Sequence, residues 1–187
     1  MNHFYQNIKG FMSKKNIGLF DLVVSESYEN FTWIELGSWT GKSAAYCTVE
    51  LINKPLKEFQ FICVDTWQGA EEHQDYNIIK EKKLEEIFKN NMSPVKQHYK
   101  SIKSFSHEAA LLFNDNSIDF CYVDADHSYE GVTKDLTAWW PKIKPGCYFG
   151  GDDYTKGWPG VQQAVNDFFK KKNIKVRKIG RCWYVSK

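Results

Sequence analysis

An apolar, strand-forming run that stops at two carboxylates and an imidazole places the strongest constraint on the fold. Residues 118–123 (IDFCYV) are mostly apolar, with β-branched and aromatic side chains, and Asp124, Asp126 and His127 follow at once. A second acidic cluster, GGDDY at residues 150–154, ends the next strand-like run. Chemistry in open α/β sheets gathers at the carboxyl ends of the strands. We therefore expect these two strand ends to form one site.

Strand-like and helix-like segments alternate along the chain, which predicts a parallel sheet covered by helices on both faces. The expected strands are residues 32–36, 59–64, 95–99, 118–123, 147–149, 174–177 and 182–185. The expected helices are residues 42–53, 76–91, 106–113, 130–140 and 159–172, with Ser106 as an N-cap, and residues 64–76 form a polar loop. The short connection at Gly180 predicts that the two final strands are antiparallel.

The first 31 residues have a weaker pattern. The helical spacing of Phe4, Ile8, Phe11 and Met12 predicts a short leading helix, followed by a loosely patterned segment. We expect residues 1–31 to cap the domain or to cover a substrate.

Composition indicates a single soluble domain and argues against several classes of protein. A chain of 187 residues suits one hydrophobic core, and a net charge of +2 is too small to imply nucleic-acid binding. No apolar run approaches the ~20 residues that span a bilayer, and the N-terminus lacks the apolar centre of a signal peptide. The five cysteines are scattered without a C-x-x-C pair, which fits free thiols in a reducing cytosol. We expect a cytoplasmic protein that binds neither membranes nor nucleic acid.

A second group of candidate residues lies where the first expected strand runs into the first expected helix. Glu35-x-Gly37-x-x-x-Gly41 occupies this junction, where glycines let the backbone approach a ligand. Asp65 ends the second strand and is placed to accept hydrogen bonds from a ribose. An ordinary tight turn is the alternative for an isolated pair of glycines. The dinucleotide fingerprint G-x-G-x-x-G is absent, and a glutamate beside the loop would repel a pyrophosphate.

An acid followed by G-x-x-x-G resembles the first motif of the class I S-adenosylmethionine-dependent methyltransferases, and the order of elements resembles theirs over nearly the whole chain. The resemblance implies a Rossmann-like α/β fold in one domain, residues 1–187. Its sheet would have seven mostly parallel strands and an antiparallel C-terminal strand. It also implies S-adenosylmethionine as the cofactor. The cofactor-binding candidates are Glu35, Gly37, Ser38, Gly41, Asp65, Trp67, Ser106 and Asp124.

The run VDADHSYEGVTKDLTAWWPKIKPGCYFGGDDY resembles the metal-dependent O-methyltransferases of the macrocin and mycinamicin type, and more distantly the catechol and caffeoyl-coenzyme A enzymes. The resemblance implies that Asp124, Asp152 and Asp153 hold Mg²⁺ or Mn²⁺ and that His127 is the catalytic base. The catechol and caffeoyl enzymes have an asparagine at the position of Asp153, so the resemblance implies a pocket here that is more anionic than theirs. Carboxylates suit a hard cation, and a neutral imidazole can deprotonate a hydroxyl that the cation makes more acidic.

Three residues beside these strand ends have two interpretations each. Asp126 either caps the following turn or supports the metal ligands. Tyr154 and Trp158 either wall a substrate site or pack in the core.

We therefore predict an S-adenosylmethionine-dependent, divalent-metal-dependent O-methyltransferase that acts on a hydroxyl of a small molecule such as a sugar, polyketide or catechol. A nicotinamide-dependent oxidoreductase and a nucleic-acid methyltransferase are the alternatives. The basic run KKKNIKVRKIGR would suit phosphates, but we interpret it as solvated surface. The strand end DADH also differs from the proline-rich aromatic motif with which base methyltransferases hold a flipped base. The short N-terminal segment predicts an acceptor pocket that is open or is completed by another subunit, hence a possible homo-oligomer.

Overall fold

A seven-stranded sheet forms the centre of the protein. The computed structural model describes residues 1–70 and 73–187, so residues 71–72 of the predicted polar loop lie outside the described residues. The strands are β1 (Phe31–Leu36), β2 (Phe59–Asp65), β3 (Tyr99–Lys103), β4 (Ile118–Val123), β5 (Ile143–Gly151), β6 (Arg177–Ile179) and β7 (Cys182–Ser186). Their order across the sheet is β3-β2-β1-β4-β5-β7-β6. The first five are parallel, whereas β7 is antiparallel to both of its neighbours. The predicted fold class is confirmed.

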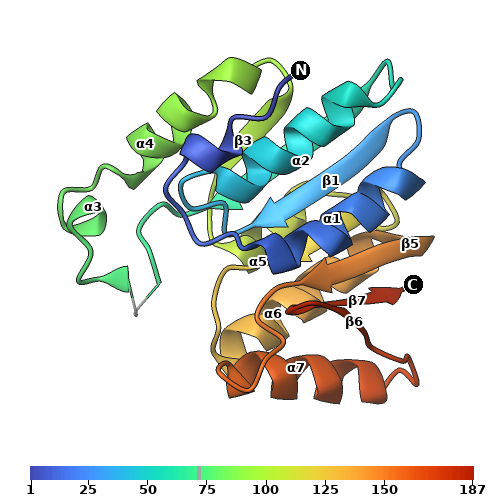
Figure 1. Cartoon of the computed structure of the whole chain (residues 1–187). Helices are drawn as coiled ribbons and strands as arrows, with labels where there is room; N and C mark the ends of the chain where they lie inside the picture. Colours follow the sequence, from blue (N-terminus) through green and yellow to red (C-terminus); the bar gives the residue numbers. More distant parts are fainter. Residues whose placement is uncertain (71–72) are drawn as a thin grey trace.

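Helices cover both faces of the sheet (Figure 1). They are α1 (Lys14–Glu26), α2 (Lys42–Asn53), α3 (Asn77–Lys80), α4 (Leu84–Asn91), α5 (Ser106–Ala109), α6 (Tyr129–Trp139) and α7 (Pro159–Lys170). Short 3-10 turns lie at η1 (Tyr5–Asn7), η3 (Ser93–Val95), η4 (Ala110–Leu112) and η5 (Trp140–Lys142). Buried side chains of α1, α2 and α4 contribute to one core, and those of α5, α6 and α7 to the other. No helix of the described residues is long and apolar enough to cross a membrane.

The central strands β1 and β4 supply side chains to both cores. Trp33 of β1 and Phe120 of β4 lie in the core beneath α1 and α2, with ring centroids 4.7 Å apart. The next residues, Ile34 and Cys121, lie in the opposite core. Every residue of both strands is buried. Because both faces of a parallel sheet are covered, such strands are mostly apolar along their length, and their prediction is confirmed.

The short leading helix predicted for the N-terminal segment is placed wrongly. Phe4, Ile8, Phe11 and Met12 do not share a helix; instead α1 begins after Ser13, whose hydroxyl accepts a hydrogen bond from the backbone of Lys15. The buried face of α1 consists of Asn16, Leu19, Phe20, Val23 and Val24. This spacing of three and four residues is a helical pattern, and the polar Asn16 within it obscures the first turn.

Several boundaries also differ from the predictions. Residues 76–91 form two helices, α3 and α4, because the backbone turns left-handed at Lys82 (φ 54°). The third strand covers 99–103 instead of 95–99, and the buried Val95 belongs to the turn η3. Strand β5 begins four residues earlier than expected and runs through Pro145 and Gly146, beside a register shift against β4.

Two further differences concern the edges of the fold. Strand β6 covers 177–179 instead of 174–177. The α-helix that begins at Ser106 has Phe105 as its N-cap and ends at Ala109, so the prediction of Ser106 as the N-cap is wrong.

Candidate active site

The loops that follow β1 and β4 are in direct contact at one edge of the sheet. Leu36 and Val123 are paired in register, and the backbone N–H of Asp124 donates to the carbonyl of Leu36 at 2.9 Å. Gly37 has a φ of 84°, and a Cβ atom placed on it would lie 1.9 Å from the carbonyl oxygen of Asp124. A side chain therefore cannot fit at Gly37 without a movement of the backbone. The glycine loop and the acidic strand end, predicted from separate motifs, lie together.

Asp65 holds the loops after β1 and β2 against each other. One carboxylate oxygen accepts the backbone N–H of Trp39 at 2.8 Å, and the other accepts that of Trp67 at 2.7 Å. The indole N–H of Trp67 in turn donates to the carbonyl of Trp39 at 3.2 Å. Burial raises the pKa of Asp65, and these backbone hydrogen bonds lower it. The structure thus gives Asp65 an anchoring role in addition to the predicted contact with a ribose.

Glu35 is a buried carboxyl group in the middle of the sheet. It is 1% exposed, and burial raises its pKa to about 7, against the effect of the Ser38 and Ser43 hydroxyls. Its Oε2 atom accepts no hydrogen bond from any residue that the structure describes. A buried charge without a partner is costly, and a nearby cation would relieve that cost. This acid beside a glycine loop therefore fits a positively charged ligand such as a sulfonium cofactor.

The raised pKa of Glu35 predicts a pH-dependent cost to stability. The folded protein keeps the proton up to about pH 7, whereas the unfolded chain loses it near 4.5, so stability falls as the pH rises through this window. Glu35→Gln removes this dependence. The free energy of unfolding of Glu35→Gln minus that of wild type should be about 3 kcal/mol larger at pH 8 than at pH 4, because only wild type loses stability over this range. Urea unfolding at both values measures this change, with the exposed Glu26→Gln as the control. An equal difference at both pH values would contradict the assignment.

The other predicted cofactor residues lie around these loops with different environments. Ser38 is buried, and Gly41 (φ 86°) is the N-cap of α2, where a Cβ atom would lie 2.9 Å from the side chain of Met92. The hydroxyl of Ser106 donates to Asp135 of α6, and its carbonyl accepts the indole N–H of Trp139. Ser106 is therefore tied to α6, and its contact with a cofactor stays a prediction.

Three donors converge beyond the ends of β4 and β5. Asp124, His127 and Asp153 each offer one ligand atom, and these atoms lie within 4.8 Å of one another. The Nε2 atom of His127 is 3.1 Å from Asp153 Oδ2 and 3.6 Å from Asp124 Oδ1. The imidazole stacks on the indole of Trp158, with ring centroids 4.2 Å apart. Two carboxylates and an imidazole at this spacing suit a small divalent cation, so the residues fit the predicted metal.

Asp152 is not a member of that group of three and has other partners. Its Oδ2 atom accepts the side-chain amide of Asn16 at 2.6 Å, and its Oδ1 atom lies 3.0 Å from Arg181 Nε. Burial raises the pKa of Asp152, and Arg181 lowers it. Its role as a metal ligand stays a prediction. Asp153, with a φ of 57°, is the member of the pair that turns toward His127.

Asn16 and Arg181 are site residues that sequence reasoning missed. Asn16 lies in the N-terminal segment that was expected to be loosely patterned, and Arg181 lies in the basic run that was expected to be solvated surface. For Arg181 that interpretation is wrong, since its guanidinium makes ion pairs with both Asp152 and Asp153. A polar residue on the buried face of a helix was the available signal for Asn16.

Each of the three neighbouring residues makes a contact that bears on its two interpretations. Asp126 caps the turn, because its Oδ1 atom accepts the backbone N–H of Ser128 at 2.7 Å. Trp158 contacts His127 and therefore belongs to the site. Tyr154 donates its hydroxyl to Asn166 on α7 at 2.6 Å, which is a packing role.

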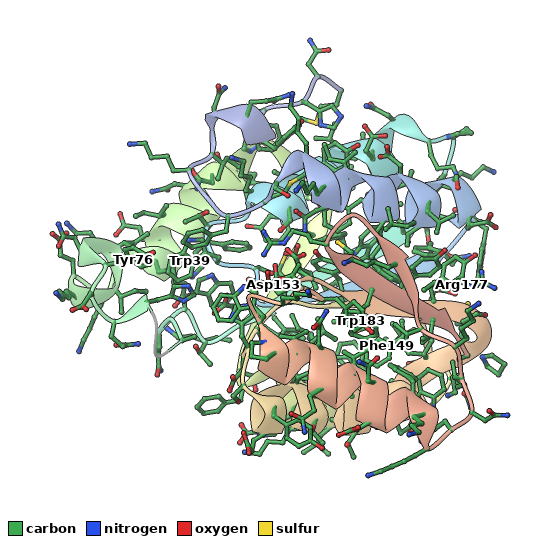
Figure 2. All side chains as sticks on the ribbon, turned by 60° about the horizontal axis from the view of Figure 1, so that its bottom comes forward. Trp39, Tyr76, Phe149, Asp153, Arg177 and Trp183 are labelled. Atoms are coloured by element: carbon green, nitrogen blue, oxygen red, sulfur yellow. The ribbon has the colours of Figure 1, made fainter. Side chains whose placement is uncertain are left out.

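An apolar pocket lies beside the glycine loop, with a cavity volume of about 680 Å³. Phe11, Trp39, Tyr76 and Ile87 contribute to its walls. Figure 2 shows Trp39 and Tyr76 together on one side of Asp153. The N-terminal segment thus lines a pocket beside the glycine loop, and whether it covers a substrate there stays a prediction.

Comparison with known proteins identifies the family. A model of a methyltransferase domain matches residues 34–154, which is more than half of the chain. The match includes the glycine loop, the end of β4 and the acidic pair formed by Asp152 and Asp153. The chain belongs to this methyltransferase domain family. An uncharacterized protein of Acanthamoeba polyphaga mimivirus is 30% identical over 144 residues. The match covers 74% of this chain and 59% of that protein, so the chain spans about three fifths of its relative.

Solved methyltransferases share the fold at low sequence identity. The O-methyltransferase NovP is 17% identical with a TM-score of 0.74, and the match covers 92% of this chain and 79% of that one. MycE, from the mycinamycin biosynthetic pathway and in complex with Mg and SAH, is 14% identical with a TM-score of 0.60. That match covers 95% of this chain and 50% of MycE. The predicted class I methyltransferase fold is confirmed.

Proposed function

We propose that this methyltransferase transfers a methyl group from S-adenosylmethionine to a hydroxyl of a small molecule and uses a divalent cation. The observation that carries the proposal is the convergence of Asp124, His127 and Asp153 next to the loop after β1. Support for a sulfonium cofactor comes from the buried Oε2 atom of Glu35 beside that loop, which accepts no hydrogen bond from any described residue. The presence of Mg and SAH in the fold relative MycE supports the same pair of ligands.

Each residue of the convergent group has a role in this reaction. Asp124 and Asp153 would hold the cation, which would supply Lewis acidity to a hydroxyl bound beside it. His127 accepts the hydroxyl proton at Nε2, and Trp158 fixes the plane of the imidazole by stacking. S-adenosylmethionine would supply the methyl group, and its sulfur would keep the electron pair of the carbon–sulfur bond as the new carbon–oxygen bond formed. The chain contributes mainly alignment and charge stabilisation.

A binding experiment tests the proposed cofactor against the alternatives. Calorimetry with S-adenosylmethionine, NAD and a short oligonucleotide should give binding of S-adenosylmethionine alone. Labelled S-adenosylmethionine then serves to screen sugar, catechol and polyketide hydroxyl acceptors. Binding of NAD or of the oligonucleotide instead would overturn the proposal. The acceptor class, a cytoplasmic location and a homo-oligomeric state stay predictions.

Metal removal is expected to stop methyl transfer. Without a cation, the carboxylates of Asp124 and Asp153 repel each other and no longer position the hydroxyl. Excess chelator should therefore abolish transfer to a confirmed acceptor, and Mg²⁺ or Mn²⁺ should restore it. Full activity in chelator would remove the metal from the mechanism and leave the methyl transfer itself in place.

A further inference from the structure

The tip of the β6–β7 hairpin holds the guanidinium of Arg181 against the acidic pair, Asp152 and Asp153. Arg181 follows Gly180, whose φ is 61° and whose Cβ position lies 2.3 Å from the carbonyl of Lys15 on α1. The carbonyl of Arg181 accepts the backbone N–H of Tyr154 at 2.9 Å, directly after the acidic pair. The backbone of Arg181 is therefore fixed from two sides. Its guanidinium spans the pair, with Nε 3.0 Å from Asp152 Oδ1 and Nη2 on Asp153 Oδ1.

All four oxygens of the acidic pair face a polar or charged neighbour. Arg181 takes one oxygen of each residue, Asn16 donates to the second oxygen of Asp152, and His127 faces the second oxygen of Asp153. This arrangement partly offsets the charge of the two carboxylates without an ion, because one guanidinium lies against both. The guanidinium is the fork-shaped donor that suits such a pair.

A divalent cation in the group of three would share the carboxylate of Asp153 with this guanidinium. Asp153 is a member of the group of three ligand atoms and also a partner of Arg181. A cation bound there would lie beside a fixed positive charge and would be repelled by it. The Arg181 side chain is 30% exposed and has a flexible stem, so the guanidinium can turn toward solvent while its backbone stays in place.

We propose that Arg181 competes with the divalent cation for Asp153 and thereby sets the metal affinity of the site. The inference rests on the metal of the proposed function. In the ion-free protein Arg181 holds the acidic pair together, and binding of the cation releases Asp153 from it. Arg181 is thus a positioning residue that determines how tightly, and at what concentration, the cation binds.

Metal binding itself tests this inference. We expect Arg181→Gln to bind Mn²⁺ more tightly than wild type, on the order of tenfold, because a partly exposed charge interaction is removed. Titration calorimetry and the electron paramagnetic resonance signal of free Mn²⁺ both measure this affinity. Arg177→Gln is the matched control, since it removes the same charge from the same hairpin; Figure 2 shows Arg177 far from Asp153. Its Mn²⁺ affinity should equal that of wild type.

The outcomes separate this inference from the proposed function. Equal or weaker Mn²⁺ binding by Arg181→Gln, with clear binding by wild type, overturns the role of Arg181 and leaves the metal in place. Absence of Mn²⁺ binding by wild type and both variants overturns the metal itself, and the inference with it.

Thermal unfolding provides a second readout. Without metal, Arg181→Gln leaves the buried carboxylates of Asp152 and Asp153 without the guanidinium and should melt at a lower temperature than wild type. Saturating Mn²⁺ should raise the melting temperature of this variant more than that of wild type. If this variant does not fold, Arg181→Lys tests the same point, because one ammonium cannot bridge both residues as the guanidinium does. It should bind Mn²⁺ more tightly than wild type. An unchanged affinity in that case overturns the inference.

Discussion

His127→Ala is expected to lower turnover by on the order of 10²–10⁴-fold, the range for removal of a positioned general base. The Nε2 atom of the ring lies 3.1 Å from Asp153 and 3.6 Å from Asp124, so it stands beside the residues that would hold the cation. The base works only as the neutral imidazole, so the wild-type rate should rise with pH through one ionisation that the variant lacks. The measurement is a pH–rate profile of both proteins with a confirmed acceptor.

Binding measurements and a control variant complete this test. S-adenosylmethionine affinity should be unchanged in His127→Ala, and the exposed His98→Ala should keep wild-type turnover. Near-normal turnover with the same pH limb would remove His127 from proton transfer. A large loss of Mn²⁺ affinity in the variant would show instead that the imidazole is a metal ligand, which its place in the group of three permits.

Gly37→Ala is expected to destabilise the protein severely. A Cβ atom there would lie 1.9 Å from the carbonyl oxygen of Asp124 and 2.6 Å from its carbonyl carbon, and the φ of 84° is unfavourable for alanine. The loop after β4 must move away, and Asp124 moves with it. We expect a loss of roughly 4 kcal/mol or more in the free energy of unfolding, or about 10 °C in Tm. Urea and thermal unfolding measure the loss.

Gly146→Ala separates the collision from the backbone strain. Gly146 has nearly the same φ, 81°, but among the described residues no atom lies within 4 Å of its Cβ position. Gly146→Ala should therefore lower the free energy of unfolding only by the cost of an alanine in the left-handed region, about 1–2 kcal/mol. If both variants lost the same amount, close contact between the loops after β1 and β4 would not be the reason that position 37 is glycine.

The strand ends that build the site are predictable from local pattern. Strands β1, β4 and β5 stop where an apolar run meets polar or charged side chains, and the alternation with helices requires parallel strands whose carboxyl ends meet at one edge. Asp124, His127 and Asp153 could therefore be predicted as neighbours although they come from two strands, whereas Asp152, predicted with them, is not in the group of three. The edge elements were less predictable. Strand β3 is half-exposed along its length and carries no clear apolar pattern.

The partners of Asp152 were decided by the tertiary structure alone. Asn16 is 136 residues away from Asp152 in the sequence, and Arg181 belongs to a basic run whose composition predicts solvated surface. An apolar pattern encodes which face of a helix or strand is buried. It does not encode which polar side chain from a distant segment arrives at that face. Hydrogen bonds and ion pairs act only over a few ångströms, so they exist only after the helix α1 and the β6–β7 hairpin have packed against the sheet.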